Sequence, residues 1–330
     1  MNKTGLVLDA VFEDHDTGPA HPERGTRLAA IRRALGDRGL VERCERIDPE
    51  PIDGTLLERI HDPKYIARVE AACRDGEAFI DTADSAICPK SHEIALLAAG
   101  AVVKAVDAVM DGALDNAFCA VRPPGHHAER DRSMGFCLLN NVALAAERLV
   151  WHHKLERVLI VDFDVHHCNG TQHTFEHSHQ VLVASLHGDP GSVYPGTGLA
   201  QETGLGPGRG YTLNLPMKPG ADGLAYREAF VEHLLPAVER FEPQFVLISA
   251  GFDAHRLDPL APICLETPDY DWMTRWLMDL ATRHGRGRLV STLEGGYHPG
   301  VLGDCCALHL SLLTDYDAKG AAAGHESQVW

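Results

Sequence analysis

Two aspartates and a histidine, Asp162, Asp164 and His166, occupy alternate positions directly after the apolar run 158–161. A short β-branched run without charges is typical of a strand buried on both faces of a parallel sheet. Alternate side chains of an extended chain share one face, so we expect these three to leave the strand's carboxyl end together. Two carboxylates held close together repel each other unless a cation lies between them. The residues therefore predict a metal site, and the alternative is a solvated acidic strand end with incidental histidines.

Oxygen and nitrogen donors of this kind suit zinc. A catalytic zinc ion has three protein ligands and keeps one position open. Open α/β sheets bind their ligands beyond the carboxyl ends of the strands, which is where these residues are expected. The sequence therefore predicts that the metal site is also a reaction site.

A second candidate group follows an earlier strand, 116–121. The segment Pro-Pro-Gly-His-His, called here the PPGHH turn (residues 123–127), ends in His126 and His127. Its prolines and glycine exclude regular structure and restrict the backbone. Adjacent histidines held in a rigid turn beside a strand end suit general acid–base catalysis, whereas an isolated pair of histidines is usually a surface feature. Two more apolar strands end near polar residues, one before Asp253 and one before Tyr297.

The elements that must position these side chains alternate between strands and helices. The expected strands cover 6–8, 116–121, 158–161, 181–186, 211–215, 245–250 and 289–293, and the expected helices cover 24–35, 64–72, 93–110, 138–149, 224–241 and 269–284. Such alternation predicts a central parallel sheet between two layers of helices. Without a linker, a composition break or an internal repeat, we expect a single domain over residues 1–330, with its core at about 5–313 and a loose tail at about 318–330.

The composition excludes several classes of function. The chain has 330 residues, is 45% hydrophobic and carries a net charge of −17, which disfavours binding to nucleic acids or to anionic membranes. Its apolar runs are too short to span a bilayer, and its N-terminus lacks the apolar core of a signal peptide. Nine cysteines without a CxxC pair are typical of reduced thiols, so we expect a cytoplasmic protein.

Together the motifs resemble one family. RPPGHHA, GFC, DFDVHHCNGTQ, SLHGDP, PGTG, GFDAHRLDPL and EGGY occur in the order and spacing of histone deacetylases, over about residues 9–313. The chain is most similar to the bacterial histone-deacetylase-like amidohydrolases of the class II type, whose relatives include acetylpolyamine and acetoin-utilisation proteins. The resemblance implies an arginase/deacetylase-like three-layer α/β/α fold and zinc-dependent hydrolysis of acetyl amides.

The resemblance also implies roles for individual residues. Asp164, His166 and Asp253 would bind zinc, which a ligand set without a thiolate favours, and Fe²⁺ is the alternative. His127 would be the main general acid–base and His126 its partner. The supporting residues would be Asp162 beside His126, Asn169 beside His127, and Tyr297 as donor to the substrate carbonyl.

Two further sets of residues come from the same resemblance. One potassium ion would use atoms of Asp162, Asp164, His166, Ser185 and Leu186, and a second would use carbonyls of Phe175, Ser178, Val181 and Tyr211. Substrate contacts would come from Phe136, Tyr194, Gly135, Leu260, Asp84 and Gly295.

Two residues depart from the family pattern, since Cys168 stands where glycine is usual and Tyr194 where a tunnel phenylalanine is usual. We expect Cys168 to be a packed thiol rather than an extra metal ligand.

We expect a hydrolase acting on acetylated or related acylated lysine-like amines. The alternatives are a deacylase of acetylpolyamines or another small amide, a non-catalytic acyl-binding protein, and an arginase-like dimanganese hydrolase. Leu260 weighs against polyamines, because polyamine-specific relatives carry glutamate there. An intact His127 and Tyr297 weigh against the non-catalytic alternative, and the oligomeric state, including a homo-oligomer, is left open.

Overall fold

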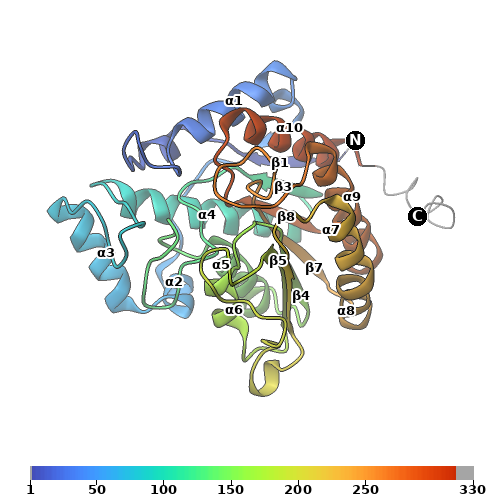
Figure 1. Cartoon of the computed structure of the whole chain (residues 1–330). Coiled ribbons are helices and arrows are strands. Elements are labelled where there is room, and N and C mark those ends of the chain that lie inside the picture. Colours follow the sequence, from blue (N-terminus) through green and yellow to red (C-terminus); the bar gives the residue numbers. More distant parts are fainter. Residues whose placement is uncertain (1, 317–330) are drawn as a thin grey trace.

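An eight-stranded parallel sheet forms the centre of the computed structural model, which describes residues 2–316 (Figure 1). The strand order is β2-β1-β3-β8-β7-β4-β5-β6. The strands are β1 (Thr4–Val7), β2 (Glu45–Arg46), β3 (Asn116–Cys119), β4 (Val158–Asp162), β5 (Val181–Gly188), β6 (Thr212–Met217), β7 (Phe245–Ala250) and β8 (Leu289–Leu293). Every pairing is parallel, as the alternation of strands and helices predicted. The tail expected at about 318–330 lies outside the described residues.

Helices cover both faces of this sheet. The α-helices are α1 (Thr26–Asp37), α2 (Gly54–Ile60), α3 (Pro63–Asp75), α4 (Ser91–Met110), α5 (Asn141–Glu147), α6 (Asn169–Phe175), α7 (Gly223–Ala229), α8 (Leu235–Phe241), α9 (Thr267–Gly285) and α10 (Pro299–Asp315). The short 3₁₀ or π segments are η1 (Ala10–Asp14), η2 (Val41–Arg43), η3 (Arg148–His152), η4 (Gly206–Gly208) and η5 (Phe230–Leu234).

The helices form two layers. In Figure 1, α4 and α5 lie on one side of the sheet, α7, α8 and α9 lie on the other, and α10 lies beside α1. Contacts of α4 and α5 with the strands, and of α9 and α10 with the strands, agree with this arrangement. The expected three-layer α/β/α fold is therefore confirmed.

The central strands explain why the sheet forms. The sequences VLIVD of β4 and FVLISA of β7 are buried at every position, which agrees with strands covered on both faces. Local signals set the ends of several helices. For example, α3 begins after the N-cap Asp62 with Pro63 in its first turn, and it ends at Gly76, whose φ is 75°.

Three helices and one strand were missed by the sequence analysis: α2, α6, α10 and the two-residue β2. The largest of these, α10, is apolar around most of its circumference because it packs against both α1 and α9. A helix buried on several sides lacks the polar stripe by which amphipathic helices are recognised. Its first turn also contains Pro299 and Gly300, which are more typical of loops.

The order of the strands positions the candidate site. The strands β3, β8, β7, β4 and β5 are consecutive neighbours in the sheet. Because they are parallel, their carboxyl ends lie side by side along one edge. Residues far apart in the sequence, from 122 to 297, therefore follow strands that end next to one another.

No helix within residues 2–316 is long and apolar enough to cross a membrane. The single-domain boundaries predicted from the sequence stay a prediction.

Candidate active site

Asp164, His166 and Asp253, called here the metal cluster, meet beyond the adjacent ends of β4 and β7. Ligand atoms of the three residues lie within 4.8 Å of one another. His166 Nδ1 lies 3.0 Å from Asp164 Oδ1 and 3.1 Å from Asp253 Oδ2, so the nitrogen stands between two carboxylate oxygens. Both carboxylates are fully buried, and the imidazole is 8% exposed.

The predicted reason for this convergence was wrong, because the chain does not stay extended. Strand β4 ends at Asp162, and a bend covers residues 164–166. The bend is stabilised by the N–H of Asp164 donating to Asp162 Oδ1 at 3.0 Å and by the N–H of His166 donating to Asp164 Oδ1 at 2.9 Å. As a result Asp162 faces His126, whereas Asp164 and His166 face Asp253.

Two glycines provide the space in which the carboxylates meet. A Cβ on Gly251 would lie 2.2 Å from Asp164 Oδ2, and one on Gly295 would lie 2.1 Å from Asp253 Oδ2. The N–H of Gly295 donates to Asp164 Oδ2 at 2.7 Å. Any larger residue at either position would displace a candidate ligand.

The electrostatics of the metal cluster fit a divalent cation. Burial and the charge of Asp164 raise the pKa of Asp253 to about 7. Burial alone lowers the pKa of His166, but the Asp164 and Asp253 carboxylates outweigh it and raise that pKa to about 10. Two buried carboxylates and one imidazole thus compete for one proton, and a cation at their centre would remove this conflict. Their oxygen and nitrogen donors suit zinc and also Fe²⁺.

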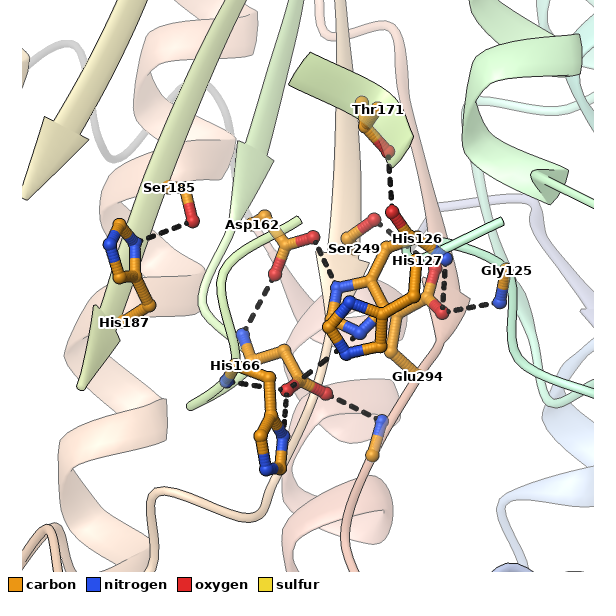
Figure 2. Close-up of polar contacts among 12 residues, drawn as sticks. Gly125, His126, His127, Asp162, His166, Thr171, Ser185, His187, Ser249 and Glu294 are labelled. Atoms are coloured by element: carbon orange, nitrogen blue, oxygen red, sulfur yellow. Dashed lines mark hydrogen bonds and ion pairs between the residues drawn. The ribbon is translucent and has the colours of Figure 1, made fainter. Parts of the chain in front are cut away.

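His126 is held beside the metal cluster by Asp162. Its Nδ1 lies 3.0 Å from Asp162 Oδ2 (Figure 2). Its Nε2 lies 3.9 Å from Asp164 Oδ1. Burial lowers the pKa of His126, but the Asp162, Asp164 and Glu294 carboxylates outweigh this effect and raise it to about 10. This imidazole is therefore suited to carry a positive charge.

His127 has the opposite properties. Its Nδ1 lies 2.7 Å from Asn169 Oδ1, while the amide nitrogen of Asn169 donates to Glu129 Oε1 at 2.5 Å. Glu129 thus orients the amide so that its oxygen accepts the Nδ1–H of His127 and leaves Nε2 unprotonated. Burial and the charges of His126 and His166 keep the pKa of His127 well below its usual value. A neutral imidazole with a free Nε2 can accept a proton.

Tyr297 follows β8 and is held from both sides. Its backbone N–H donates to Asp258 Oδ2 at 2.6 Å. The Arg27 guanidinium lies 5.1 Å from the centre of its ring, and the Phe136 ring stands edge-on at 5.8 Å. Burial and the nearby Asp253 and Asp164 charges raise the pKa of Tyr297 well above its usual value, so its hydroxyl remains a donor.

The sequence analysis missed the buried ion pairs beneath Tyr297. Arg27 donates to the carbonyl of Gly296 at 2.7 Å and pairs with Glu23 at 3.0 Å. Glu23 also pairs with Arg122 at 2.5 Å, and all three charged side chains are buried. The segment that contains Glu23 precedes the helix expected at 24–35, and the sequence analysis assigned it no role. Its only signal was a pair of charged residues, Glu23 and Arg27, at helical spacing.

An aromatic wall stands over His127. A Cβ on Gly135 would lie 2.2 Å from His127 Cδ2, and Gly135 and Phe136 have φ values of 55° and 69°. These two left-handed residues turn the backbone so that it passes close to the imidazole. The Tyr194 ring stands edge-on at 5.1 Å from that of His127 and is 40% exposed. The expected substrate contacts Phe136, Tyr194 and Gly135 therefore lie together.

The other expected substrate contacts are placed as follows. Leu260 lies in the loop after β7 and is 41% exposed. Its N–H donates to Asp258, the residue that also holds Tyr297. The Asp84 carboxylate accepts the hydroxyl of Thr82, and its carbonyl contacts His21 Nε2 at 3.2 Å.

The residues expected to bind potassium lie in two places. Asp162 pairs in register with Ser185 across β4 and β5, next to Leu186 and the bend that carries Asp164 and His166. The second set lies at the amino end of β5 and before β6. Here the Phe175 carbonyl accepts the N–H of Ser178 at 2.8 Å, and the Tyr211 carbonyl accepts that of Val183 at 3.0 Å.

Cys168 is fully buried, and burial raises the pKa of its thiol well above the usual value. It belongs to the hydrophobic core, as expected for a packed thiol.

The comparisons with known proteins agree with one another. The histone deacetylase domain pattern matches residues 21–313. A histone deacetylase-like amidohydrolase from Pseudomonas aeruginosa is 41% identical over 284 residues, which cover 86% of this chain and 73% of that protein. A probable deacetylase from Archaeoglobus fulgidus is 39% identical over 296 residues, covering 89% and 81% respectively. The crystal structure of the HDA15 HD domain matches with a TM-score of 0.90 and 36% identity, covering 95% of this chain and 90% of that chain.

Proposed function

The chain belongs to the histone deacetylase family, as its motifs suggested, and we propose that it is a zinc-dependent amidohydrolase removing acetyl or related acyl groups from lysine-like amines. The family and its named relatives support a deacetylase or amidohydrolase. The observation that carries the finer proposal is the pairing of a neutral His127, whose Nε2 is free, with the adjacent metal cluster.

Each residue has a task in this reaction. A zinc ion held by Asp164, His166 and Asp253 would lower the pKa of water to about 7 and polarise the substrate carbonyl. His127 takes the proton of the attacking water at Nε2 and returns it to the leaving amine. His126, paired with Asp162, supplies positive charge beside the reacting atoms. Tyr297 donates its hydroxyl proton in a hydrogen bond to the carbonyl oxygen as negative charge develops there.

The aromatic wall supports a linear substrate. Phe136 and Tyr194 would flank the aliphatic part of an acylated lysine, with Gly135 leaving room beside His127. Asp84 and Leu260 would contact the substrate at the rim, and Gly295 would lie near the acyl group. An apolar Leu260 provides no carboxylate for a second cation, which favours acyl-lysine over acetylpolyamines.

The remaining assignments extend this proposal. One potassium ion would lie among Asp162, Asp164, His166, Ser185 and Leu186, and a second among the carbonyls of Phe175, Ser178, Val181 and Tyr211. We also propose that the enzyme acts in the cytoplasm, and either a monomer or a homo-oligomer is compatible with this function.

One substrate panel tests the proposal. Zinc-loaded wild-type protein is assayed on acetyl-lysine peptides, longer acyl-lysines and acetylpolyamines, with a hydroxamate inhibitor and the His127→Ala variant as controls. We expect hydroxamate-sensitive release of acetate from acetyl-lysine peptides and little activity on acetylpolyamines. A zinc-loaded, folded wild type that hydrolyses none of these amides would overturn the proposed function.

A further inference from the structure

Glu294 is a buried carboxylate that makes three hydrogen bonds behind the two catalytic histidines. It directly follows β8 and is fully buried. Its Oε2 accepts the backbone N–H of Gly125 at 2.7 Å and that of His126 at 3.2 Å, and its Oε1 accepts the hydroxyl of Ser249 at 3.2 Å (Figure 2). Glu294 is the first residue of the EGGY motif, and the sequence analysis predicted no role for it.

This carboxylate does not form a second metal site. His126, Cys137 and Glu294, called here the Glu294 cluster, have ligand atoms within 4.8 Å of one another. However, His126 Nδ1 is bonded to Asp162, the Cys137 thiol donates to the Gly135 carbonyl at 3.3 Å, and both oxygens of Glu294 accept protein donors. Burial also raises the pKa of Cys137 well above its usual value, so its thiol is neutral in the metal-free protein.

The two N–H groups that Glu294 accepts belong to the PPGHH turn. This turn follows the end of β3 and contains no regular structure, so its buried N–H groups have no partner strand. A buried N–H without an acceptor costs about 1–3 kcal/mol. Glu294 therefore provides the hydrogen-bond acceptors for these two N–H groups, which in the sheet come from the carbonyls of a neighbouring strand.

Glu294 is itself firmly held. Its backbone N–H donates to the Ala250 carbonyl at 2.9 Å, and its own carbonyl accepts Arg27 Nη2 at 2.5 Å. Through Ser249 its side chain also contacts β7. Glu294 thus connects the segments that follow β3 and β8 with the end of β7. One of its bonds is to His126, the first of the two adjacent histidines.

We propose that Glu294 is a positioning residue, whose two hydrogen bonds to the PPGHH turn hold His126 and His127 against the metal cluster. This inference rests on the proposed amidohydrolase function for its catalytic consequence. The structural part, the anchoring of the turn, does not require that function.

Three substitutions test separately the two properties of the Glu294 side chain, its hydrogen-bond acceptors and its negative charge. Glu294→Gln keeps the length of the side chain, and its carbonyl oxygen can accept both N–H groups while its amide nitrogen faces Ser249 Oγ. Glu294→Asp keeps the charge but withdraws the acceptor by one methylene. Glu294→Ala removes both. Ser249→Ala is the matched control, because it removes the third bond and leaves the two bonds to the turn.

The first measurement is steady-state kinetics of the zinc-loaded variants on the best amide substrate, with zinc content and melting temperature measured for each. We expect Glu294→Ala and Glu294→Asp to lose about 100-fold in kcat, the scale of a small misplacement of catalytic groups, with little change in KM. Glu294→Gln and Ser249→Ala should stay within about threefold of the wild type. Glu294→Ala or Glu294→Asp within threefold of wild-type kcat, or Glu294→Gln as impaired as Glu294→Asp, would overturn the proposal.

The second measurement is hydrogen–deuterium exchange of the peptide containing the amides of Gly125 and His126, in metal-free protein. We expect faster exchange in Glu294→Asp and Glu294→Ala, and exchange like that of the wild type in Glu294→Gln. If Glu294→Ala does not fold, the pair Glu294→Gln and Glu294→Asp decides the question. Unchanged exchange in Glu294→Asp refutes the anchoring, whereas an inactive wild type with the expected exchange pattern refutes only the amidohydrolase function.

Discussion

The metal cluster and the Glu294 cluster are built from similar residues, yet they differ in what their acceptor atoms face. Each contains three potential ligands within 4.8 Å, all of them buried. In the Glu294 cluster, both carboxylate oxygens accept N–H or O–H groups of the protein. In the metal cluster, the one partner of Asp253 Oδ2 among residues 2–316 is His166 Nδ1, which also contacts the other carboxylate.

This difference shows that proximity of ligand types does not define a metal site. Bonded carboxylate oxygens do not by themselves separate the two clusters, because both oxygens of Asp164 also accept N–H groups, from His166 and Gly295. The clusters differ in their imidazoles: His126 Nδ1 pairs with Asp162, outside the Glu294 cluster, whereas His166 Nδ1 lies between the two carboxylates of its own cluster. Buried acceptors that face one another repel until a cation neutralises them. We therefore expect cation binding at the metal cluster and propose that the Glu294 cluster anchors a turn.

Removing a ligand from the metal cluster should have the largest effect. Asp253→Ala takes away one of the two carboxylates of the cluster, the one whose Oδ2 lies 3.1 Å from His166 Nδ1. We expect bound zinc to fall from about one per chain to nearly none, together with all activity. Zinc content by mass spectrometry of metal ions checks this, with the partly exposed Asp271→Ala as control. Wild-type zinc content in Asp253→Ala would mean that the cluster was assigned wrongly.

His127→Ala should be the next largest in effect, because this side chain borders the metal cluster without being one of its ligands. We expect a loss of about 10²–10⁴ in kcat, the usual contribution of a positioned general base, with zinc content unchanged. Measuring His126→Ala in parallel distinguishes the two imidazoles. If His126→Ala is much more impaired than His127→Ala, the roles of the two histidines are reversed.

Tyr297→Phe removes one hydroxyl and leaves the ring between Arg27 and Phe136. A single donor to a developing negative charge is worth about 2.7–4 kcal/mol, so we expect kcat to fall by about 10²–10³ with little change in KM. Zinc content and melting temperature should stay at wild-type values. A variant within a few-fold of wild-type kcat would show that Tyr297 only packs.

The Glu294 cluster can be tested through the pH dependence of stability. Burial, together with the Asp162 and Asp164 charges, raises the pKa of Glu294 from 4.5 to about 7, against the opposing effect of His126. Because the pKa of Glu294 is higher in the folded state, this residue contributes its full stabilisation of the fold below pH 4.5. The contribution is lost as the pH rises to about 7. Glu294→Gln cannot titrate, so we expect the wild type to lose up to about 3 kcal/mol more than the variant across this range.

Chemical denaturation of metal-free protein at several pH values measures this difference between wild type and Glu294→Gln. Asp253 titrates in both proteins, so its contribution cancels in the comparison. Parallel pH curves for the two proteins would show that Glu294 keeps an ordinary pKa.

Cys137→Ser should have the smallest effect and sharpens the contrast between the clusters. A serine hydroxyl can replace the thiol as donor to the Gly135 carbonyl. We expect unchanged zinc content and a kcat within about threefold of the wild type, because the thiol binds no metal. Loss of a metal equivalent in this variant would instead make the Glu294 cluster a second metal site.

The sequence by itself determined the architecture and the edge of the sheet at which the candidate site residues gather. Unbroken apolar runs such as β4 and β7 indicate buried parallel strands, because burial on both faces requires apolar side chains at every position. Polar residues directly after such runs must lie at the carboxyl edge of the sheet. The pairing of His126 with Asp162 and of His127 with Asn169 agrees with the roles that the family motifs implied.

Only the tertiary structure decided which side chains face each other. The alternation of Asp162, Asp164 and His166 indicated one shared face, but a bend after β4 separates Asp162 from the other two, and the side-chain hydrogen bonds within that bend stabilise it. The contacts of Glu294 and Glu23 bridge up to 267 positions in the sequence. Hydrophobic periodicity reports on local burial alone, whereas the direction of a side chain beyond a strand end depends on partners that the fold brings from elsewhere.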